Sequence, residues 1–103
     1  MKITIQDVVK QLKKVIDPEI GMNIVDIGLI YDIKIVDYIV KIKMSLTTPG
    51  CPLQEYFISE IESVLLDLVI DDVEIEIIWD PPWDMSMMDE DAKLEFFNSM
   101  RPN

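Results

Sequence analysis

The sequence predicts a single α+β domain, residues 1–103, in which helices pack on a small mixed three-stranded sheet in the order α-β-β-α-β-α. Apolar residues recur at helical spacing in two long segments, 4–16 and 53–69. Apolar and polar residues alternate in three shorter segments, 29–36, 39–46 and 73–79, as in half-buried strands. The chain has 103 residues, and 50% of them are hydrophobic, which suffices for one domain with its own core.

The first helix is expected over residues 4–16. Thr4 and Asp7 form an acidic capping box at its start. Pro18 marks its end, because the residue before a proline disfavours the helical region. The apolar face of this helix comprises Ile5, Val8, Val9, Leu12, Val15 and Ile16. Residues 17–28 combine turn-forming and apolar residues, so we expect a loop tied to the core.

The segments 29–36 and 39–46 are expected to pair as an antiparallel hairpin around a turn at Asp37-Tyr38. The side chains predicted to face the core are Leu29, Tyr31, Ile33 and Ile35 in the first strand and Val40, Ile42, Met44 and Leu46 in the second. Those predicted to face outward include Lys41, Lys43 and Ser45.

The longest helix is expected over residues 53–69, followed by a strand over 73–79 that would lie parallel to the second strand. The segment 80–84 holds two prolines and cannot continue a central strand. Ser86 with Asp89 forms a second capping box, which predicts a last helix of about residues 87–99.

The formal net charge is −11, and it is unevenly distributed. Residues 1–50 hold seven lysines and six acids, a charge of +1, whereas residues 51–103 hold two basic residues and fourteen acids, a charge of −12. Such a surface repels phosphate backbones, so we expect no nucleic-acid partner. The acidic half serves solubility, meets a basic protein or holds cations.

Several function classes are excluded or disfavoured by composition. The chain has no histidine, which excludes a Ser-His-Asp or Cys-His triad within it. Its single cysteine rules out an internal disulfide and fits a reducing compartment. We see no secretory leader and no apolar run approaching the roughly 18 residues of a membrane span. We therefore expect a soluble cytoplasmic protein that does not contact a membrane.

Cys51 is the residue best equipped for chemistry of its own. If Pro52 is the first residue of the long helix, Cys51 lies near its N-cap, where backbone N–H groups and the helix dipole favour a thiolate. A thiolate there is a nucleophile or a soft-metal ligand. The alternative is a small buried hydrophobic residue at a loop–helix junction.

Three neighbouring features have a structural and a functional interpretation each. Thr47 and Thr48 either orient a ligand or tie the loop to its own backbone. Asp26 is a carboxylate among apolar residues, and it either serves chemistry or caps its own loop. Trp83 follows two prolines and either walls a pocket, faces a partner or covers the end of the sheet.

Four segments in order along the chain carry a resemblance to a known family. They are Asp17-Pro18-Glu19-Ile20-Gly21, Asn23-Ile24-Val25-Asp26-Ile27-Gly28-Leu29-Ile30-Tyr31, Thr47-Thr48-Pro49-Gly50-Cys51-Pro52-Leu53 and Trp79-Asp80-Pro81-Pro82-Trp83. Together they closely resemble the MIP18 family, also called the domain of unknown function 59 family. That family includes SufT-like iron–sulfur maturation factors and PaaD-like subunits.

The resemblance implies a domain similar to other iron–sulfur assembly domains, with a role in maturing iron–sulfur proteins. Its implied partners are the iron–sulfur assembly machinery and client apoproteins, and family members look like adaptors more often than enzymes with turnover. The reactive cysteine of the pattern falls on Cys51 and its loop acid on Asp26, while Thr48 and Trp83 match the flanking motifs. Cys51, Asp26 and Thr48 are therefore the candidate cofactor-binding residues, with Cys51 as the candidate metal ligand.

The ligand count limits what one chain can hold. An iron–sulfur cluster normally takes four thiolates, and this chain has one cysteine. A homodimer would supply two, and the remainder would come from a small thiol, a carboxylate or a partner. We therefore expect a labile iron–sulfur cluster shared between chains or with a partner.

Three hypotheses about function follow. The first is a maturation factor that uses Cys51 directly to carry or transfer a cluster or to recruit targets. The second is a PaaD-like adaptor subunit of a multicomponent complex, in which Cys51 is structural. The third is a carrier of persulfide sulfur on Cys51, which would depend on the helix end alone because the chain supplies no histidine base.

Overall fold

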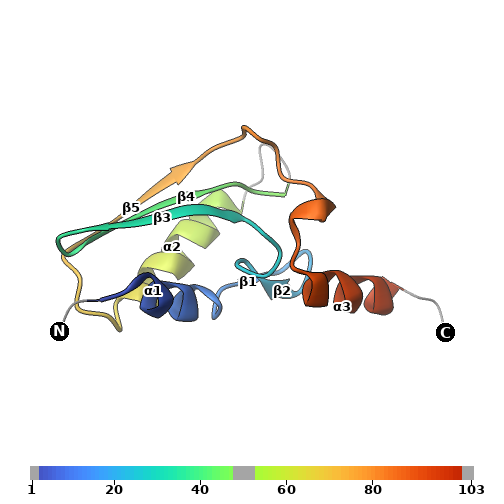
Figure 1. Ribbon diagram of the computed structural model, residues 1–103, viewed down its shortest axis with the longest axis horizontal. Coiled ribbons are helices and arrows are strands. Elements are labelled where there is room, and N and C mark those ends of the chain that lie inside the picture. The colour runs from blue at the N-terminus through green and yellow to red at the C-terminus, as the bar shows by residue number, and fades with distance from the viewer. Residues whose placement is uncertain (1–2, 48–52, 101–103) are drawn as a thin grey trace.

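The expected α+β class and element order are confirmed. The computed structural model describes residues 3–47 and 53–100. Its elements are α1 (Ile5–Leu12), β1 (Ile16–Asp17), β2 (Met22–Asn23), β3 (Ile30–Val36), β4 (Ile39–Met44), α2 (Gln54–Leu65), β5 (Asp72–Ile77), the 3₁₀ turn η1 (Met85–Met87) and α3 (Glu90–Met100). The short β1–β2 pair and η1 add to the predicted order (Figure 1).

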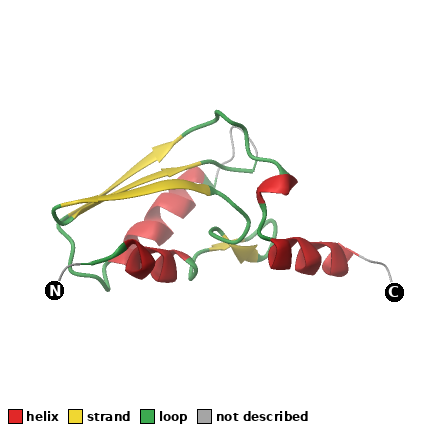
Figure 2. Ribbon diagram, viewed as in Figure 1, coloured by secondary structure: helices red, strands yellow, loops and turns green. Residues whose placement is uncertain are grey.

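The three long strands form one mixed sheet in the order β3-β4-β5. β3 and β4 are an antiparallel hairpin around Asp37-Tyr38, where Asp37 has a φ of 56°. β4 and β5 are parallel, with Ile42 opposite Ile75. They can be parallel because α2 returns the chain to the end of the sheet at which β4 starts, and β5 begins there. Helices α1 and α2 both lie on one side of this sheet, and α3 extends beyond its end (Figures 1 and 2).

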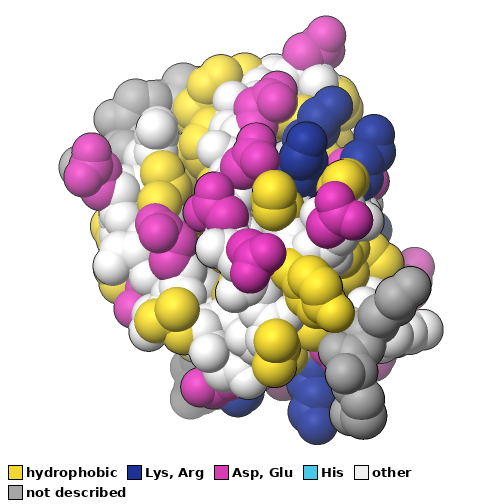
Figure 3. Space-filling model, turned by 90° about the vertical axis from the view of Figure 1, so that its left-hand side faces the viewer, with side chains coloured by type: hydrophobic (Ala, Val, Ile, Leu, Met, Phe, Trp, Pro, Cys, Tyr) yellow, Lys and Arg dark blue, Asp and Glu magenta, His cyan; other side chains and the backbone are white. Residues whose placement is uncertain are grey.

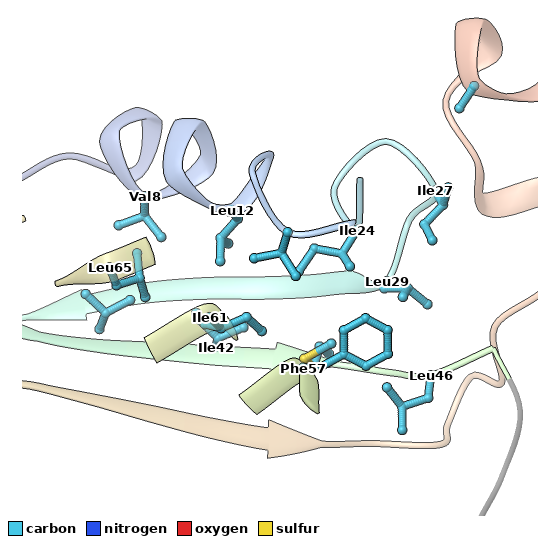
Figure 4. Close-up of a cluster of buried hydrophobic side chains, with 14 of the residues drawn as sticks. Val8, Leu12, Ile24, Ile27, Leu29, Ile42, Leu46, Phe57, Ile61 and Leu65 are labelled. Carbon is cyan, nitrogen blue, oxygen red and sulfur yellow. The ribbon is translucent and has the colours of Figure 1, made fainter. Parts of the chain in front are cut away.

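The core lies between the sheet and the two helices α1 and α2 (Figure 4). α1 contributes Val8 and Leu12, and its Thr4–Asp7 capping box forms as predicted. The predicted inward face of the second strand is buried at Val40, Ile42 and Met44 in β4 and at Leu46 just after it. The apolar side chains of α2 that pack in the same core are Phe57, Ile61 and Leu65, each at most 1% exposed. Burying such side chains contributes about 1.5–3 kcal/mol each, which holds these layers together.

The first predicted helix is too long at its C-terminal end. Lys14 and Val15 donate to the carbonyls of Gln11 and Leu12, three residues back, so the chain tightens and leaves the helix after Leu12. Ile16 then pairs with Asn23 across β1 and β2. Val15 stays buried as predicted, whereas Ile16 is 43% exposed.

The remaining boundary errors are also local. α2 covers residues 54–65 rather than 53–69, because Leu66 and Leu68 donate to carbonyls three residues back and the chain turns toward β5. Ser45 was predicted to face outward and is fully buried, its N–H donating to the carbonyl of Leu29 beyond the end of the hairpin ladder.

The last helix also starts later than predicted. Asp84, rather than Ser86, caps a helical turn: its carboxylate accepts from the Ser86 N–H at the start of η1. α3 then begins at Glu90. In the part of the chain that the structure describes, no helix has the length and apolar character needed to cross a membrane.

Candidate functional site

Two of the motif segments, 23–31 and 79–83, lie near the end of the sheet where β3 begins and β5 ends. At this end of the sheet Ile30 pairs with Met44, and Met44 pairs with Ile77. Beyond the regular ladder, Ser45 donates to the carbonyl of Leu29 at 2.9 Å and Ile78 donates to that of Met44 at 2.8 Å. Because β4 and β5 are parallel, both strands finish at the same end of the sheet, and Leu46 and Ile78 follow them there.

The loop before β3 is built around Asn23. Its side-chain oxygen accepts the N–H groups of Val25 and Asp26 at 3.1 and 2.9 Å, and its amide nitrogen donates to the Asp26 carboxylate at 2.9 Å. Ile24 and Ile27 are fully buried, so this loop is tied to the core as predicted. The arrangement is the local side-chain turn that asparagine favours.

The segment after β5 docks on this loop through two hydrogen bonds and on the start of β3 through a third. The indole Nε1 of Trp83 donates to the Ile27 carbonyl at 2.6 Å, and the Asp89 N–H donates to the Asp26 carbonyl at 2.6 Å. The Tyr31 hydroxyl donates to the carbonyl of Pro81 at 2.8 Å. Trp83 is half-buried, which matches the covering role considered for it.

Gly28 permits this docking. Its φ is +86°, and a Cβ added there would lie 2.3 Å from the carbonyl oxygen of Met87. A side chain at this position would therefore strain the backbone and push η1 away from the loop.

Asp26 is partly exposed in a groove between the β1–β2 hairpin and α3. Its carboxylate lies 3.8 Å from the Lys13 ammonium, and 35% of its side chain is exposed. The groove holds about 330 Å³ and is lined by Ile16, Gly21, Met22, Asn23, Asp26, Asp91, Ala92 and Glu95. Three carboxylates in one groove attract cationic groups. Sequence reasoning did not select Asp91 and Glu95, because nothing in a helical pattern shows which loop the helix will meet.

Thr48 and Cys51 lie outside the described residues. The described chain stops at Thr47, which follows the buried Leu46, and resumes at Leu53, which packs against the core. α2 begins at Gln54, one residue after the predicted start at residue 53, and its N-cap is Leu53, so the expected position of the N-cap near Cys51 is wrong. In residues 3–47 and 53–100, no three His, Cys, Asp or Glu side chains are arranged to hold a metal ion.

Comparison with known proteins identifies the family. The model of a family described as "iron–sulfur cluster assembly protein" matches residues 5–77. The chain belongs to this family. The match covers every element from α1 to β5 and three of the four motif segments in full.

Curated relatives support the assignment over most of their length. The chain is 38% identical over 91 residues to the Fe–S protein maturation auxiliary factor YitW of Bacillus subtilis, covering 86% of this chain and 89% of that protein. It is 40% identical over 82 residues to the Fe–S protein maturation auxiliary factor SufT of Staphylococcus aureus, covering 78% and 93%. The resemblance drawn from the four motif segments is confirmed.

Solved structures confirm the fold. A domain of unknown function 59 protein from Bacillus anthracis superposes with a TM-score of 0.84 at 32% identity, over 93% of this chain and 92% of that one. A conserved hypothetical protein from Thermotoga maritima superposes with a TM-score of 0.79 at 40% identity, over 92% and 95%. Both superpositions cover nearly the whole of each chain, so these two proteins share the fold described above.

Proposed function

We propose that this protein is a non-catalytic factor in iron–sulfur protein maturation, which carries or transfers a labile cluster or recruits target proteins. The observation that carries the proposal is the extent of the match to proteins named as Fe–S maturation auxiliary factors, which covers 86% of this chain and 89% of the relative. Its implied partners are the assembly machinery and client apoproteins.

The residues on either side of segment 48–52, which contains Cys51, support a role for this segment. Both flanks of this segment are anchored: Leu46 is 2% exposed, and Leu53 packs on the core and begins α2. The docked segment with Trp83 covers the adjacent loop 23–28. A loop held at both ends by a rigid scaffold is a common position for functional residues.

In this proposal the cluster is cargo rather than a resident cofactor. The chain has one cysteine and a cluster normally takes four thiolates, so Cys51 contributes one ligand to a site completed by a second copy, a small thiol or a partner. Asp26 and Thr48 are the other proposed contributors from this chain. A site with so few ligands from one chain releases its cluster readily, which suits transfer.

The second candidate function is an adaptor in which Cys51 is structural. The observation that favours it is that Leu66 is 77% exposed and Val69 is 73% exposed, since docking on a partner would cover such side chains. An adaptor would contribute docking surfaces to an assembly complex and would not contact the cluster.

Anaerobic reconstitution with ferrous iron and sulfide distinguishes the two functions. Direct use of Cys51 predicts a visible charge-transfer absorption in the wild type that is lost in Cys51→Ser. Size-exclusion chromatography with absorbance detection would show whether the colour elutes with a dimer. Asp26→Asn is a second variant, expected to weaken but not abolish the absorption. Equal spectra in the wild type and Cys51→Ser would contradict direct ligation.

Complementation in cells tests the function itself. Deleting the gene should lower the activity of iron–sulfur enzymes, and the wild-type chain should restore it. Restoration by Cys51→Ser at equal protein level would favour the adaptor. Undiminished enzyme activity in the deletion strain under iron limitation would contradict both candidates.

A further inference from the structure

The outward side of α2 and the turn that follows it carry the most exposed large hydrophobic residues of the described chain. Leu66 is 77% exposed and Val69 is 73% exposed. Both belong to the segment that was predicted to continue the buried helix and that instead turns away toward β5. Exposed side chains of this size contribute to a docking surface where they lie beside other apolar residues, as Leu66 lies beside Ile58.

A shallow trough runs along the same side of α2. It holds about 510 Å³ and is lined by Glu55, Ile58, Ser59, Glu62, Ser63 and Leu66. These residues recur three and four positions apart, so they share one face of the helix, opposite the buried Phe57, Ile61 and Leu65. The floor contains two serines one turn apart, and small side chains let a second helix approach closely.

The charge of this face is of one sign. Glu55, Glu60 and Glu62 are the charged residues of α2, and the helix has no basic residue. Asp67, Asp71 and Asp72 follow it, and within the described chain the one ion pair among them joins Asp67 to Lys14 at 4.0 Å. Figure 3 shows the end of the molecule that carries the β3–β4 turn. Acidic and hydrophobic side chains mix across its left and centre, and basic side chains gather at the upper right and the bottom.

We propose that this α2 face, Glu55 to Leu66, binds a basic amphipathic helix of a partner protein. The partner's apolar side chains would cover Ile58 and Leu66, and its lysines or arginines would face Glu55 and Glu62. A second copy of this chain fits less well, because it would bring a face of the same negative charge against this one. The inference goes beyond the proposed function, and it does not depend on Cys51.

The probe is a labelled synthetic helical peptide with leucines three and four residues apart and lysines between them, measured by fluorescence anisotropy. A scrambled peptide of the same composition and a leucine–glutamate peptide serve as comparisons. We expect the wild type to bind the amphipathic lysine peptide at least about tenfold more tightly than the scrambled one, a difference of about 1.4 kcal/mol.

The matched variants separate a docking face from general attraction to an acidic protein. Glu62→Lys on the α2 face and Glu76→Lys on the exposed face of β5 change the net charge equally. We expect Glu62→Lys and Leu66→Ser each to weaken binding about tenfold or more, and Glu76→Lys to weaken it by about twofold or less. Equal losses in Glu62→Lys and Glu76→Lys, or equal binding of the scrambled peptide, would overturn the proposal.

Two further measurements complete the test. Peptide-induced amide shifts in the protein's NMR spectrum should centre on residues 55–66, and shifts centred elsewhere would overturn the proposal. Sedimentation of the protein without peptide should show either a monomer or a dimer that Leu66→Ser leaves intact. A dimer that Leu66→Ser abolishes would mean that a second copy covers the α2 face, and it would overturn the proposal. Cys51→Ser should bind the peptide as the wild type does, so failure of the cluster experiment leaves this result unaffected.

Discussion

Replacing Gly28 with alanine tests how the segment after β5 is held against the loop before β3. Gly28 has a φ of +86°, and its α-carbon faces the backbone of Met87 so closely that an added Cβ would lie 2.3 Å from the Met87 carbonyl oxygen. The obstacle is backbone rather than the end of a flexible side chain, so it cannot rotate aside. Either the segment moves or the loop does.

The cost follows from two separate contributions. A left-handed backbone costs a residue with a Cβ about 1–2 kcal/mol. Forcing an extra carbon into a packed contact costs about 1–3 kcal/mol more. Gly21 is the matched control, because its φ is +81° and nothing lies within 4 Å of its added Cβ. Gly21→Ala therefore measures the backbone contribution alone.

Urea denaturation of both variants measures the difference. We expect Gly28→Ala to lower the free energy of unfolding by about 1–3 kcal/mol more than Gly21→Ala does. If the segment undocks instead, the loss of global stability is smaller, but the indole of Trp83 becomes exposed. In a Trp79→Phe background the fluorescence of Gly28→Ala would then shift to longer wavelength. Equal stability and equal emission in the two alanine variants would refute the reasoning.

Three smaller changes test other contacts. Trp83→Phe leaves the buried Ile27 carbonyl without its donor and should cost about 1–3 kcal/mol in urea denaturation, and an unchanged midpoint would contradict that contact. Ile61→Ala, at a fully buried position in α2, should cost about 2–5 kcal/mol by thermal or urea unfolding, whereas a loss below about 1 kcal/mol would mean that the core collapses around the gap. Two hydrogen bonds from Ser86, first that of its hydroxyl and then that of its backbone N–H, hold the pKa of Asp84 below the usual 3.8. The stability that the Asp84 carboxylate contributes is therefore present above the unfolded-state pKa, and it is lost as the pH falls through the lower folded-state pKa. An NMR titration should place the Asp84 midpoint below 3.8 and Ser86→Ala should raise it, while identical midpoints would exclude the hydrogen bond as the cause.

The sheet could be predicted because its strands are long enough for apolar and polar residues to alternate several times. Alternation along residues 39–46 identified four buried residues, and the capping box at Thr4 identified the start of α1. The β1–β2 pair was missed because two residues are too few to show alternation. The early end of α2 was missed because Leu66 and Val69 continue the apolar pattern while the chain has already turned toward β5.

The candidate site was predicted less completely, and the reason is distance along the chain. Motif resemblance selected Asp26, yet its hydrogen bond with Asp89 and its groove with Asp91 and Glu95 join residues more than 60 positions apart. Periodicity carries no information about such contacts. The other two selected residues, Thr48 and Cys51, lie outside the described residues, so their roles remain predictions that Cys51→Ser will test.

The two proposals concern opposite ends of one helix. Cys51 precedes α2 by three residues, whereas Leu66 follows its last residue. With 12 residues α2 is about 18 Å long, so a partner helix lying along it would reach from the exposed Leu66 to the start of α2 at Gln54. Cys51 lies three residues before Gln54 in the sequence, so we expect such a partner to supply ligands that a single cysteine does not. If that is how cargo is passed, Glu62→Lys should slow cluster transfer to a client without changing the absorption of the reconstituted protein, while Cys51→Ser should abolish the absorption without changing peptide binding. If either variant reduced cluster absorption and peptide binding equally, cluster binding and partner docking would not be separate functions of the two ends of α2.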